Sequence, residues 1–516
     1  MSETPLVLLG VDGADHRLVL RWAAEGHLPT LASLMGRGCW ATIGGPEQVC
    51  EHGSSLSLLS GVSRSRHGYY FMRQLVPGTY DLRTFSYADA DALPFWSRFA
   101  GTGKRVAVID APDSRPVKGV EGIQLANWAV HEPAAALNAP CAQPPELLEE
   151  ALAVFGPRIP VLEFKPGATF EDDLEMYRRF LRRVRRKGEM CRRLLGRGEG
   201  FDLIAVGFFE SHTAAHRFWK YRPETRGDLA RTDGGELTHA IREVYRAIDR
   251  ELGLLLEQLP SGANVFVFSA FGMEDYYTTT GLMESFCRRL GYQASPPPAG
   301  FSPKPLALAR RLLPAAWREW VGGRLPTPAQ ERLLAESFRA STDWPRTRAF
   351  NIPTLYPGFV RVNLRGREPQ GRVEPGAEYD SLLGSLEDDL MRLTDPLTGR
   401  GAVRDVVRSD VNFGGGPPAL LPDLFVEWEP HVRFMERVTH PRAELAQRRQ
   451  RYHRDSYHSR TGFLAAAGPS VGARGHTGEL SSLDVAPMFL SLLGVQAADG
   501  ASNGAARSLG CREGGS

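Results

Sequence analysis

The stretch that most constrains this chain runs from Phe201 to Lys220 and joins an apolar run to a group of polar side chains. Residues 203–209 are apolar without interruption, which is typical of a buried parallel strand. Glu210, His212 and His216 follow directly, and functional groups in open α/β sheets collect at the carboxyl ends of strands. Two histidines four residues apart share one face of a helix and can hold one metal ion. The alternative is a pair of surface histidines, one of which caps a helix.

Charge and composition argue against several classes of partner. The chain has 62 Lys and Arg residues against 60 Asp and Glu residues, a net charge of +2. Without a basic excess we expect no nucleic acid and no anionic membrane as partner. No apolar run reaches the ~18–20 residues of a membrane span, and we expect no signal peptide. The six cysteines are scattered without CxxC spacing, so we expect reduced thiols and a cytoplasmic location.

The alternation of strand-like and helix-like segments predicts the fold class. Further apolar segments with the pattern of buried strands lie at 6–12, 104–110, 122–128 and 264–273. Residues 237–259 have apolar side chains at helical spacing. We therefore expect an α/β fold with a mostly parallel, doubly wound sheet and helices on both faces.

The chain outside this pattern divides into three parts. We expect a helical excursion over the sheet at 130–200, a helical cap or lid insertion at 292–340, and a disordered tail at 497–516, which is rich in Gly, Ala and Ser. The α/β domain itself would then comprise residues 1–291 and 341–496.

The end of the first strand offers a further candidate ligand. Asp12 and Gly13 close the segment 6–12. An Asp at a strand end, followed by Gly for a tight turn, commonly presents a carboxylate to a metal. The alternative is a simple turn, since Asp-Gly also makes turns.

Several motifs, in the right order, resemble one known family. The segment Asp12-Gly13, a helix and then 26–38 resembles the start of the type I phosphodiesterase/nucleotide pyrophosphatase branch of the alkaline phosphatase superfamily. Further segments that resemble motifs of this branch lie at 57–68, 342–349, 362–371, 421–428, 457–469 and 482–495. The resemblance implies a mostly parallel sheet with a site at its carboxyl edge, and a divalent metal as cofactor.

The resemblance also points to the loop 49–55. The family carries a Thr or Ser nucleophile at the amino-terminal end of a helix, and here that position falls on Glu51, with His52 beside it. Cys50, Ser54 and Ser55 are neighbouring candidates if the register slips. A carboxylate can ligate a metal or act as a base, but it does not match a hydroxyl nucleophile. The alternative is that Glu51 and His52 merely open a helix.

For the metal site, the resemblance implies one altered and one depleted set of ligands. Three residues match the ligands of the first ion: His216 and His458, which correspond to histidines of the family, and His212, which stands in place of an Asp. Of the second set only Asp12 remains, because Ala270 and Phe271 stand where the family has Asp and His. Further possible ligands are Glu210, Glu274, Asp275 and His476. We therefore expect one ion in preference to two, with zinc favoured and manganese or iron as alternatives.

These residues lead to two hypotheses of different class. The first is a metal-dependent hydrolase or transferase that acts on a small phosphate or sulfate ester or on a phosphodiester. In it an ion lowers the pKa of water to ~7, and Glu51 or His52 serves as general base. The second is a catalytically altered relative, either a non-hydrolytic metalloenzyme of a biosynthetic pathway or a non-catalytic binding protein. The sequence predicts neither the substrate nor the oligomeric state.

Overall fold

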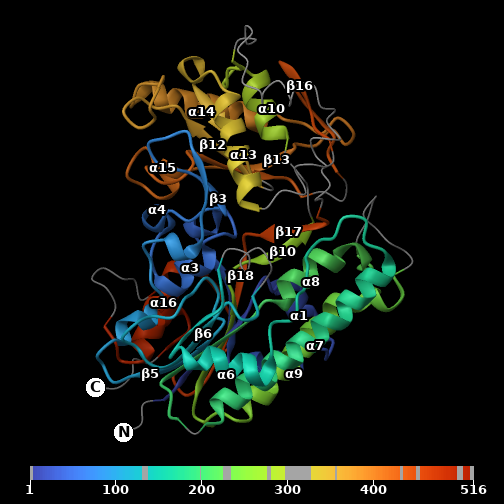
Figure 1. The fold of residues 1–516 in the computed structure, drawn as a ribbon, viewed down its shortest axis with the longest axis vertical. Coiled ribbons are helices and arrows are strands. Elements are labelled where there is room, and N and C mark those ends of the chain that lie inside the picture. Colours follow the sequence, from blue (N-terminus) through green and yellow to red (C-terminus); the bar gives the residue numbers. More distant parts are fainter. Residues whose placement is uncertain are drawn as a thin grey trace.

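The computed structural model describes residues 4–130, 138–197, 199–224, 234–275, 281–296, 327–354, 357–430, 434–448, 454–496 and 504–511. Within these residues one large sheet organises the lower lobe in Figure 1, and a smaller sheet organises the upper lobe. The strand order of the large sheet is β19-β2-β18-β9-β1-β8-β5-β6-β7. In that order the strands are Gly475–Ser481, Cys39–Gly44, Gly462–Ala467, Asn264–Ser269, Leu6–Val11, Leu203–Phe208, Arg105–Ile109, Glu121–Ala126 and Cys141–Gln143.

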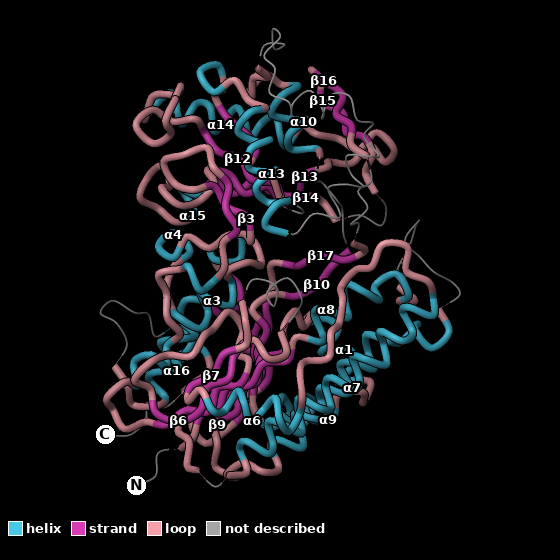
Figure 2. The backbone as a smooth tube through the Cα atoms, viewed as in Figure 1, coloured by secondary structure: helices cyan, strands magenta, loops and turns pink. Residues whose placement is uncertain are grey.

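The centre of the large sheet is parallel, as the sequence predicted. Strand β1 pairs in parallel with β8 and β9, and β5 pairs in parallel with β8 and β6. The antiparallel strands are β18, which runs against both β9 and β2, and β7 at the far edge. The predicted fold class, a mostly parallel α/β sheet, is therefore confirmed. Figure 2 shows helices packed around the strands of this sheet.

Helices cover both faces because the strand side chains alternate between two cores. In β1, Val7, Leu9 and Val11 point into one core, and Leu6 and Leu8 into the other. The first core is covered by α1 (His16–Ala24), α2 (Pro29–Arg37), α6 (Glu146–Phe155), α7 (Phe170–Leu195), α8 (Glu210–Phe218) and α9 (Ala240–Leu256). The second is covered by α3 (Ser54–Ser60), η3 (Phe95–Phe99), α16 (Ser482–Leu492) and α17 (Gly504–Ser508).

The upper lobe has a sheet and a core of its own. Its antiparallel strands, in the order β11-β12-β14-β13, are Ala349–Asn351, Gly358–Val362, Leu424–Trp428 and Val403–Arg408. They share a core with α10 (Leu282–Arg289) and α14 (Ala377–Met391), beside the hairpin of β15 (Arg437–His440) and β16 (Ala443–Ala446). The sequence analysis had placed residues 341–496 in the same domain as the large sheet. It missed this second core because short antiparallel strands give only a weak periodic pattern.

Short elements connect the lobes at the carboxyl edge of the large sheet (Figure 1). Strands β10 (Gly272–Asp275) and β17 (Ser456–Ser459) pair antiparallel there. The remaining short elements of the described residues are η1 (Pro46–Val49), α4 (Arg64–His67), β3 (Arg73–Leu75), β4 (Leu82–Thr84), η2 (Tyr87–Asp89), η4 (Trp219–Tyr221), η6 (Gly235–His239), α13 (Thr327–Ala340), η7 (Trp344–Arg346) and α15 (Ser409–Asn412).

The predicted cap and the predicted tail are only partly described. Residues 297–326, most of the predicted cap, lie outside the described residues, and the rest of the cap includes α13. In the predicted disordered tail, residues 504–511 are described and are ordered: Ala505 and Leu509 are buried. The prediction of disorder is wrong for that segment, because its small and apolar side chains complete the core beneath β19 and α16.

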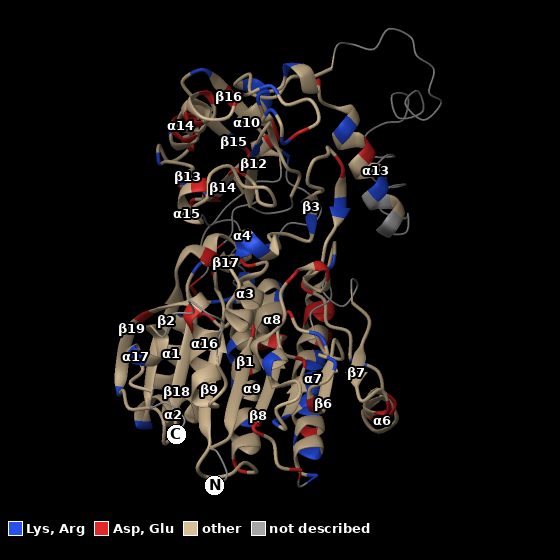
Figure 3. Cartoon of the chain, turned by 90° about the vertical axis from the view of Figure 1, so that its left-hand side faces the viewer, with Lys and Arg blue, Asp and Glu red and all other residues tan. Residues whose placement is uncertain are grey.

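The predicted excursion at 130–200 is mainly the long helix α7. Its basic and acidic residues are interspersed along the ribbon in Figure 3, while Phe180, Val184 and Cys191 are buried against the sheet. Although α7 has 26 residues, no helix among the described residues is long and apolar enough to cross a membrane.

An ion pair inside the core supports a stability prediction. Lys187 Nζ lies 2.9 Å from Asp110 Oδ2, and both side chains are fully buried. Substitution of Lys187→Met keeps most of the volume but leaves a buried carboxylate without its cation, which costs about 3–5 kcal/mol. We expect this loss in the free energy of unfolding measured with urea. Arg185→Met, on the same helix but with a side chain 72% exposed, is the control and should leave stability unchanged. Equal stability of the two variants would contradict the prediction.

Candidate metal centre

Three buried histidines converge at the carboxyl edge of the large sheet. His212 and His216 lie one turn apart on α8, which begins directly after β8, and His458 lies on β17. The Nε2 atom of His212 is 2.8 Å from that of His458 and 3.0 Å from that of His216, and the last two are 3.0 Å apart. Two nitrogens that bind one ion at ~2.0–2.1 Å can be no more than ~4 Å apart. The spacing therefore suits a single ion.

The opposite nitrogen of each ring faces an oxygen. The pairs are His212 Nδ1 with Asp12 Oδ2 at 2.8 Å, His458 Nδ1 with Glu51 Oε1 at 3.3 Å, and His216 Nδ1 with Ser456 Oγ at 3.0 Å. A neutral imidazole carries one proton, and an oxygen beside Nδ1 favours the proton there. The three Nε2 atoms, which lie close together, can then act as ligands of a shared ion. Such outer oxygen partners typically orient metal-binding histidines.

This arrangement fits a divalent cation. Burial, with a further contribution from His458, lowers the pKa of His212 to about 3, so this ring stays neutral. Three imidazole donors suit zinc, and also manganese or iron. They form the one group of at least three His, Cys, Asp or Glu donors with metal-ligand spacing among the described residues. Three protein ligands leave a position open, as in catalytic zinc sites.

Asp12 lies at the end of β1, as the sequence predicted, but its carboxylate is directed at His212. Its Oδ2 atom is the partner of His212 Nδ1, and Asp12 is not one of the three convergent donors. The turn after it brings the backbone close to α8: Gly13 has a φ of +62°, and a Cβ atom there would lie 2.9 Å from that of His212. Glycine at this position therefore allows α8 to approach β1.

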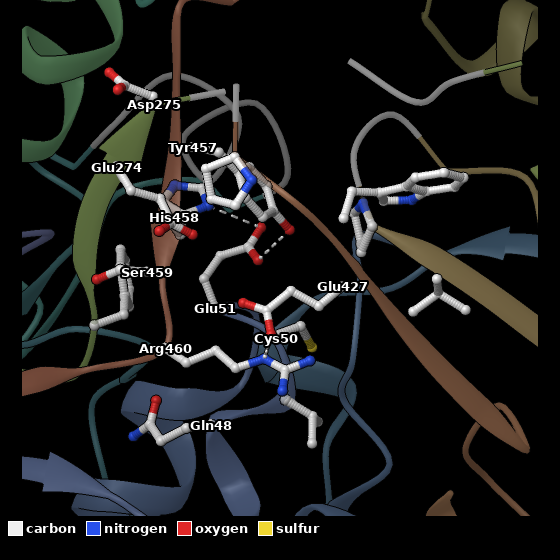
Figure 4. A pocket seen from close by; sticks show the side chains of 16 residues that line it. Gln48, Cys50, Glu51, Glu274, Asp275, Glu427, Tyr457, His458, Ser459 and Arg460 are labelled. Carbon is white, nitrogen blue, oxygen red and sulfur yellow. Dashed lines mark hydrogen bonds and ion pairs between the residues drawn. The ribbon is translucent and has the colours of Figure 1, made fainter. Parts of the chain in front are cut away.

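Glu51, at the expected nucleophile position, is the centre of a hydrogen-bond network. Its Oε1 lies 2.7 Å from His52 Nδ1 as well as 3.3 Å from His458 Nδ1, and its Oε2 accepts from the Tyr457 hydroxyl at 3.2 Å. Figure 4 shows Glu51 between Tyr457 and His458. Burial alone would raise the pKa of Glu51, but the charges and hydrogen bonds of His458 and His52 hold that pKa well below its usual range. Glu51 is placed to orient histidines.

The other residues of this loop are buried. Cys50 Sγ lies 3.2 Å from the carbonyl oxygen of Tyr70, and burial raises the pKa of the Cys50 thiol to about 12. It is therefore a poor source of thiolate. The Ser54 hydroxyl donates to the Cys50 carbonyl oxygen at 2.8 Å. Ser55 and His52 line the cavity described below.

The remaining candidates are not among the three convergent donors. Glu210 accepts from Arg183 Nε at 2.6 Å inside the core. Glu274, whose pKa burial raises to about 7, pairs with Arg404. Asp275 accepts from Trp219 Nε1 at 2.8 Å. His476 stacks on Trp40 at a ring distance of 4.1 Å on the edge strand β19, so it does not approach the site.

A phenyl ring occupies the space beside the histidines. Phe271 lies between β9 and β10, with ring centroids 5.4 Å from His212 and 5.0 Å from His458. Ala270 and Phe271 are both buried. Neither side chain can bind a cation as a ligand, so this side of the site is apolar.

Two cavities meet at the wall formed by Glu51, Phe271 and His458. The cavity in Figure 4 has a volume of about 570 Å³ and extends toward β14 in the upper lobe. The other, which we call the histidine cavity, has a volume of about 720 Å³ and reaches His212. Its lining residues are Asp12, Glu51, His52, Ser55, Tyr69, Met72, Ser86, Tyr87, Pro112, Asp113, Asn138, Glu163, Phe209, His212, Phe271, Arg454 and His458.

Three charged residues of the histidine cavity, Asp113, Glu163 and Arg454, are not among the residues predicted from the sequence. Arg454 Nη1 lies 3.2 Å from His216 Nε2, and its other terminal nitrogen pairs with Glu163. No motif marks Arg454, which stands in an arginine-rich stretch of the sequence. Asp113 could have been found, since it closely follows the strand β5, and polar residues at strand ends are the signal that located Asp12.

The fold and the histidine centre define the class of protein. It is an alkaline-phosphatase-like α/β enzyme of the phosphohydrolase type. The sequence model of the type I phosphodiesterase / nucleotide pyrophosphatase family matches residues 6–449, and the chain belongs to this family. No curated protein matches it. The predicted resemblance is confirmed.

Solved structures have the same fold at low sequence identity. Phosphonoacetate hydrolase from Sinorhizobium meliloti 1021, in complex with phosphonoformate, is 13% identical with a TM-score of 0.51, and the match covers 96% of each chain. The same enzyme in complex with phosphonoacetate is 14% identical, again with a TM-score of 0.51 and 96% of each chain covered. Murine ectonucleotide pyrophosphatase / phosphodiesterase 5 is 12% identical with a TM-score of 0.48, covering 98% of this chain and 99% of that chain.

The position of Asp12 leads to a prediction about metal affinity. If Asp12 only orients His212, Asp12→Asn should weaken metal binding about 10–100-fold and still allow full loading at high metal concentration. His212→Ala removes a donor and should prevent full loading. Competition titration with a chromogenic chelator measures both variants. Loss of binding in Asp12→Asn as complete as in His212→Ala would show instead that Asp12 is a direct ligand.

Proposed function

We propose that this protein is a hydrolase or transferase of a small phosphate, phosphonate or sulfate ester, with one divalent ion held by His212, His216 and His458. The observation that carries the proposal is the convergence of three histidine Nε2 atoms beside a cavity. An ion bound there would supply Lewis acidity to an ester oxyanion and increase the acidity of water.

The chain's own residues have separate tasks in this proposal. Arg454 lies beside His216 at the histidine cavity, and its guanidinium suits an oxyanion of the ester. Glu163 pairs with Arg454 and holds it in place. His52 lines the same cavity with one ring nitrogen held by Glu51. It can therefore take a proton from an attacking water molecule at its other nitrogen.

This assignment chooses between the bases that the sequence left open. The Glu51 carboxylate already faces His52, His458 and Tyr457, so we assign it an orienting part and assign proton transfer to His52. A reaction with these two roles needs no side-chain nucleophile. The Cys50 thiol and the Ser54 hydroxyl, which could otherwise serve as one, are buried. The site thus supports direct attack by water.

The choice of one ion in preference to two rests on Phe271. Its ring packs against His212 and His458. A second cation beside the first would need polar ligands in this place, and a phenyl ring supplies none. Zinc is the ion we propose, because three imidazoles and an open position form a common catalytic zinc site. Manganese and iron are the alternatives.

A second candidate function follows from the same apolar side. Loss of ligands at Ala270 and Phe271 is also what a binding protein, or a metalloenzyme with non-hydrolytic chemistry, would allow. The outer oxygen partners of all three histidines argue against a binding protein without metal. Such a protein does not need histidines oriented in this way. Metal content and a product-based assay separate these functions.

The comparisons support small anionic substrates. The phosphonoacetate hydrolase structures hold phosphonoacetate and phosphonoformate. The histidine cavity carries one guanidinium, that of Arg454, which suits a small anionic ester. We keep the cytoplasm as the proposed location, which suits the free thiols of all six cysteines.

The test is activity and metal content measured together. We expect about one divalent ion per wild-type chain and hydrolysis of at least one member of a panel of phosphate, phosphonate and sulfate esters. His458→Ala should lose the ion and reduce kcat/KM at least ~100-fold. The control His476→Ala changes an exposed histidine away from the site and should change neither quantity.

The outcomes are distinct. A wild-type chain that holds no ion, and gains none when zinc, manganese or iron is added, favours the binding protein. A bound ion without turnover of any ester in the panel favours non-hydrolytic chemistry.

A further inference from the structure

Asp113 is an accessible carboxyl group of the histidine cavity that the proposed reaction has not yet used. It follows β5 in the loop Asp110-Ala-Pro-Asp113. The residue as a whole is partly exposed, whereas its carboxyl group lies in buried surroundings. Its φ of +44° lies in the left-handed region, which Asp adopts more readily than most residues. Asp113 thus has an unusual backbone conformation at the cavity wall. Such conformations cluster at functional sites.

The surroundings of Asp113 favour its protonated form. Burial is the largest cause and the carboxylate of Asp12 the next, and together they raise the pKa of Asp113 to about 7. His52, Arg64 and a hydrogen bond from the backbone N–H of Leu56 act in the opposite direction. The titratable and charged groups that face it are Asp12, His52, Arg64, Tyr69 and Tyr87.

Hydrolysis of an ester needs a group that neutralises the departing oxygen. In the proposed reaction, Arg454 faces the oxyanion and His52 takes the proton of water. Neither of these contacts supplies a proton to the leaving group. A protonated carboxyl in the same cavity can do so.

We propose that Asp113 is the general acid that protonates the leaving alcohol, which rests on the proposed ester hydrolysis. The bond from phosphorus or sulfur to the alcohol oxygen breaks, and its electron pair stays on that oxygen. The Asp113 proton moves to the same oxygen, so the product leaves as a neutral alcohol. Water supplies the oxygen of the new bond and gives its proton to His52. The carboxylate of Asp113 then regains a proton from solvent.

The proposal narrows the class of substrate. A proton donor accelerates the departure of a basic alkoxide strongly and that of a stable anion little. An enzyme with Asp113 in this role is suited to esters of aliphatic alcohols, in contrast to anhydrides or activated aryl esters.

The experiment compares two esters that share an acid part and differ in the leaving group, one an alkyl alcohol and the other 4-nitrophenol. Asp113→Asn keeps the side-chain size, and Asn also tolerates a positive φ. We expect kcat/KM of the alkyl ester to fall about 100-fold or more, and that of the 4-nitrophenyl ester to fall less than about threefold. Asp91→Asn changes an exposed carboxylate and is the control that should leave both unchanged.

The pH dependence of the wild-type enzyme gives a second readout that does not depend on how the variant folds. An acid must be protonated, so the alkyl ester should lose activity as the pH rises through about 7, whereas the 4-nitrophenyl ester should keep it. Equal losses for both esters in Asp113→Asn, or equal alkaline limbs in the wild type, would overturn the role of Asp113 while leaving the proposed hydrolase intact. Failure of His458→Ala to affect either ester would instead overturn the hydrolase itself.

Discussion

The site depends on the convergence of three imidazole nitrogens. His212, His216 and His458 bring their Nε2 atoms within 2.8–3.0 Å of one another in a buried place, while each Nδ1 faces an oxygen. Three imidazole nitrogens at this spacing can bind one divalent cation, and their outer oxygen partners would orient them toward it. The ion that we propose here would therefore lie at the centre of the site.

The surroundings of Glu51 bear on the proposed reaction. Its carboxylate faces His52, His458 and Tyr457, so it supports a histidine of the candidate metal centre and a candidate base. Phe271 closes the neighbouring space with carbon. Both features support our proposal of one ion with water as the nucleophile.

Sequence patterns predicted the features that local rules can reach. The apolar runs of β1, β8 and β9 and the helical spacing of α9 showed the sheet and its cover, and the rule that polar groups follow strand ends located Asp12, His212 and His216. His458 was found through the family motif alone, because β17 is a short strand whose place beside α8 depends on its pairing with β10. The disordered tail was predicted from composition, which does not report that Ala505 and Leu509 fill a core gap.

Two features could not be predicted because they depend on tertiary contacts. The second core of the upper lobe and the contact of Arg454 with His216 depend on segments brought together from distant parts of the chain. The direction of a carboxylate is also invisible in a sequence: Asp12 was placed correctly at a strand end, but whether it points to an ion or to a histidine depends on where α8 begins. Composition and spacing therefore predict which residues meet, and the packing decides what each one does.

The central claim is that one ion is held by three imidazoles. X-ray absorption spectroscopy at the absorption edge of the bound metal tests it most directly, because the signal reports ligand type, number and distance. The account predicts three imidazole nitrogens at ~2.0–2.1 Å, with oxygen in the remaining position and no neighbouring metal. A coordination sphere dominated by carboxylate oxygens, or scattering from a second metal at ~3.5–4 Å, would contradict it.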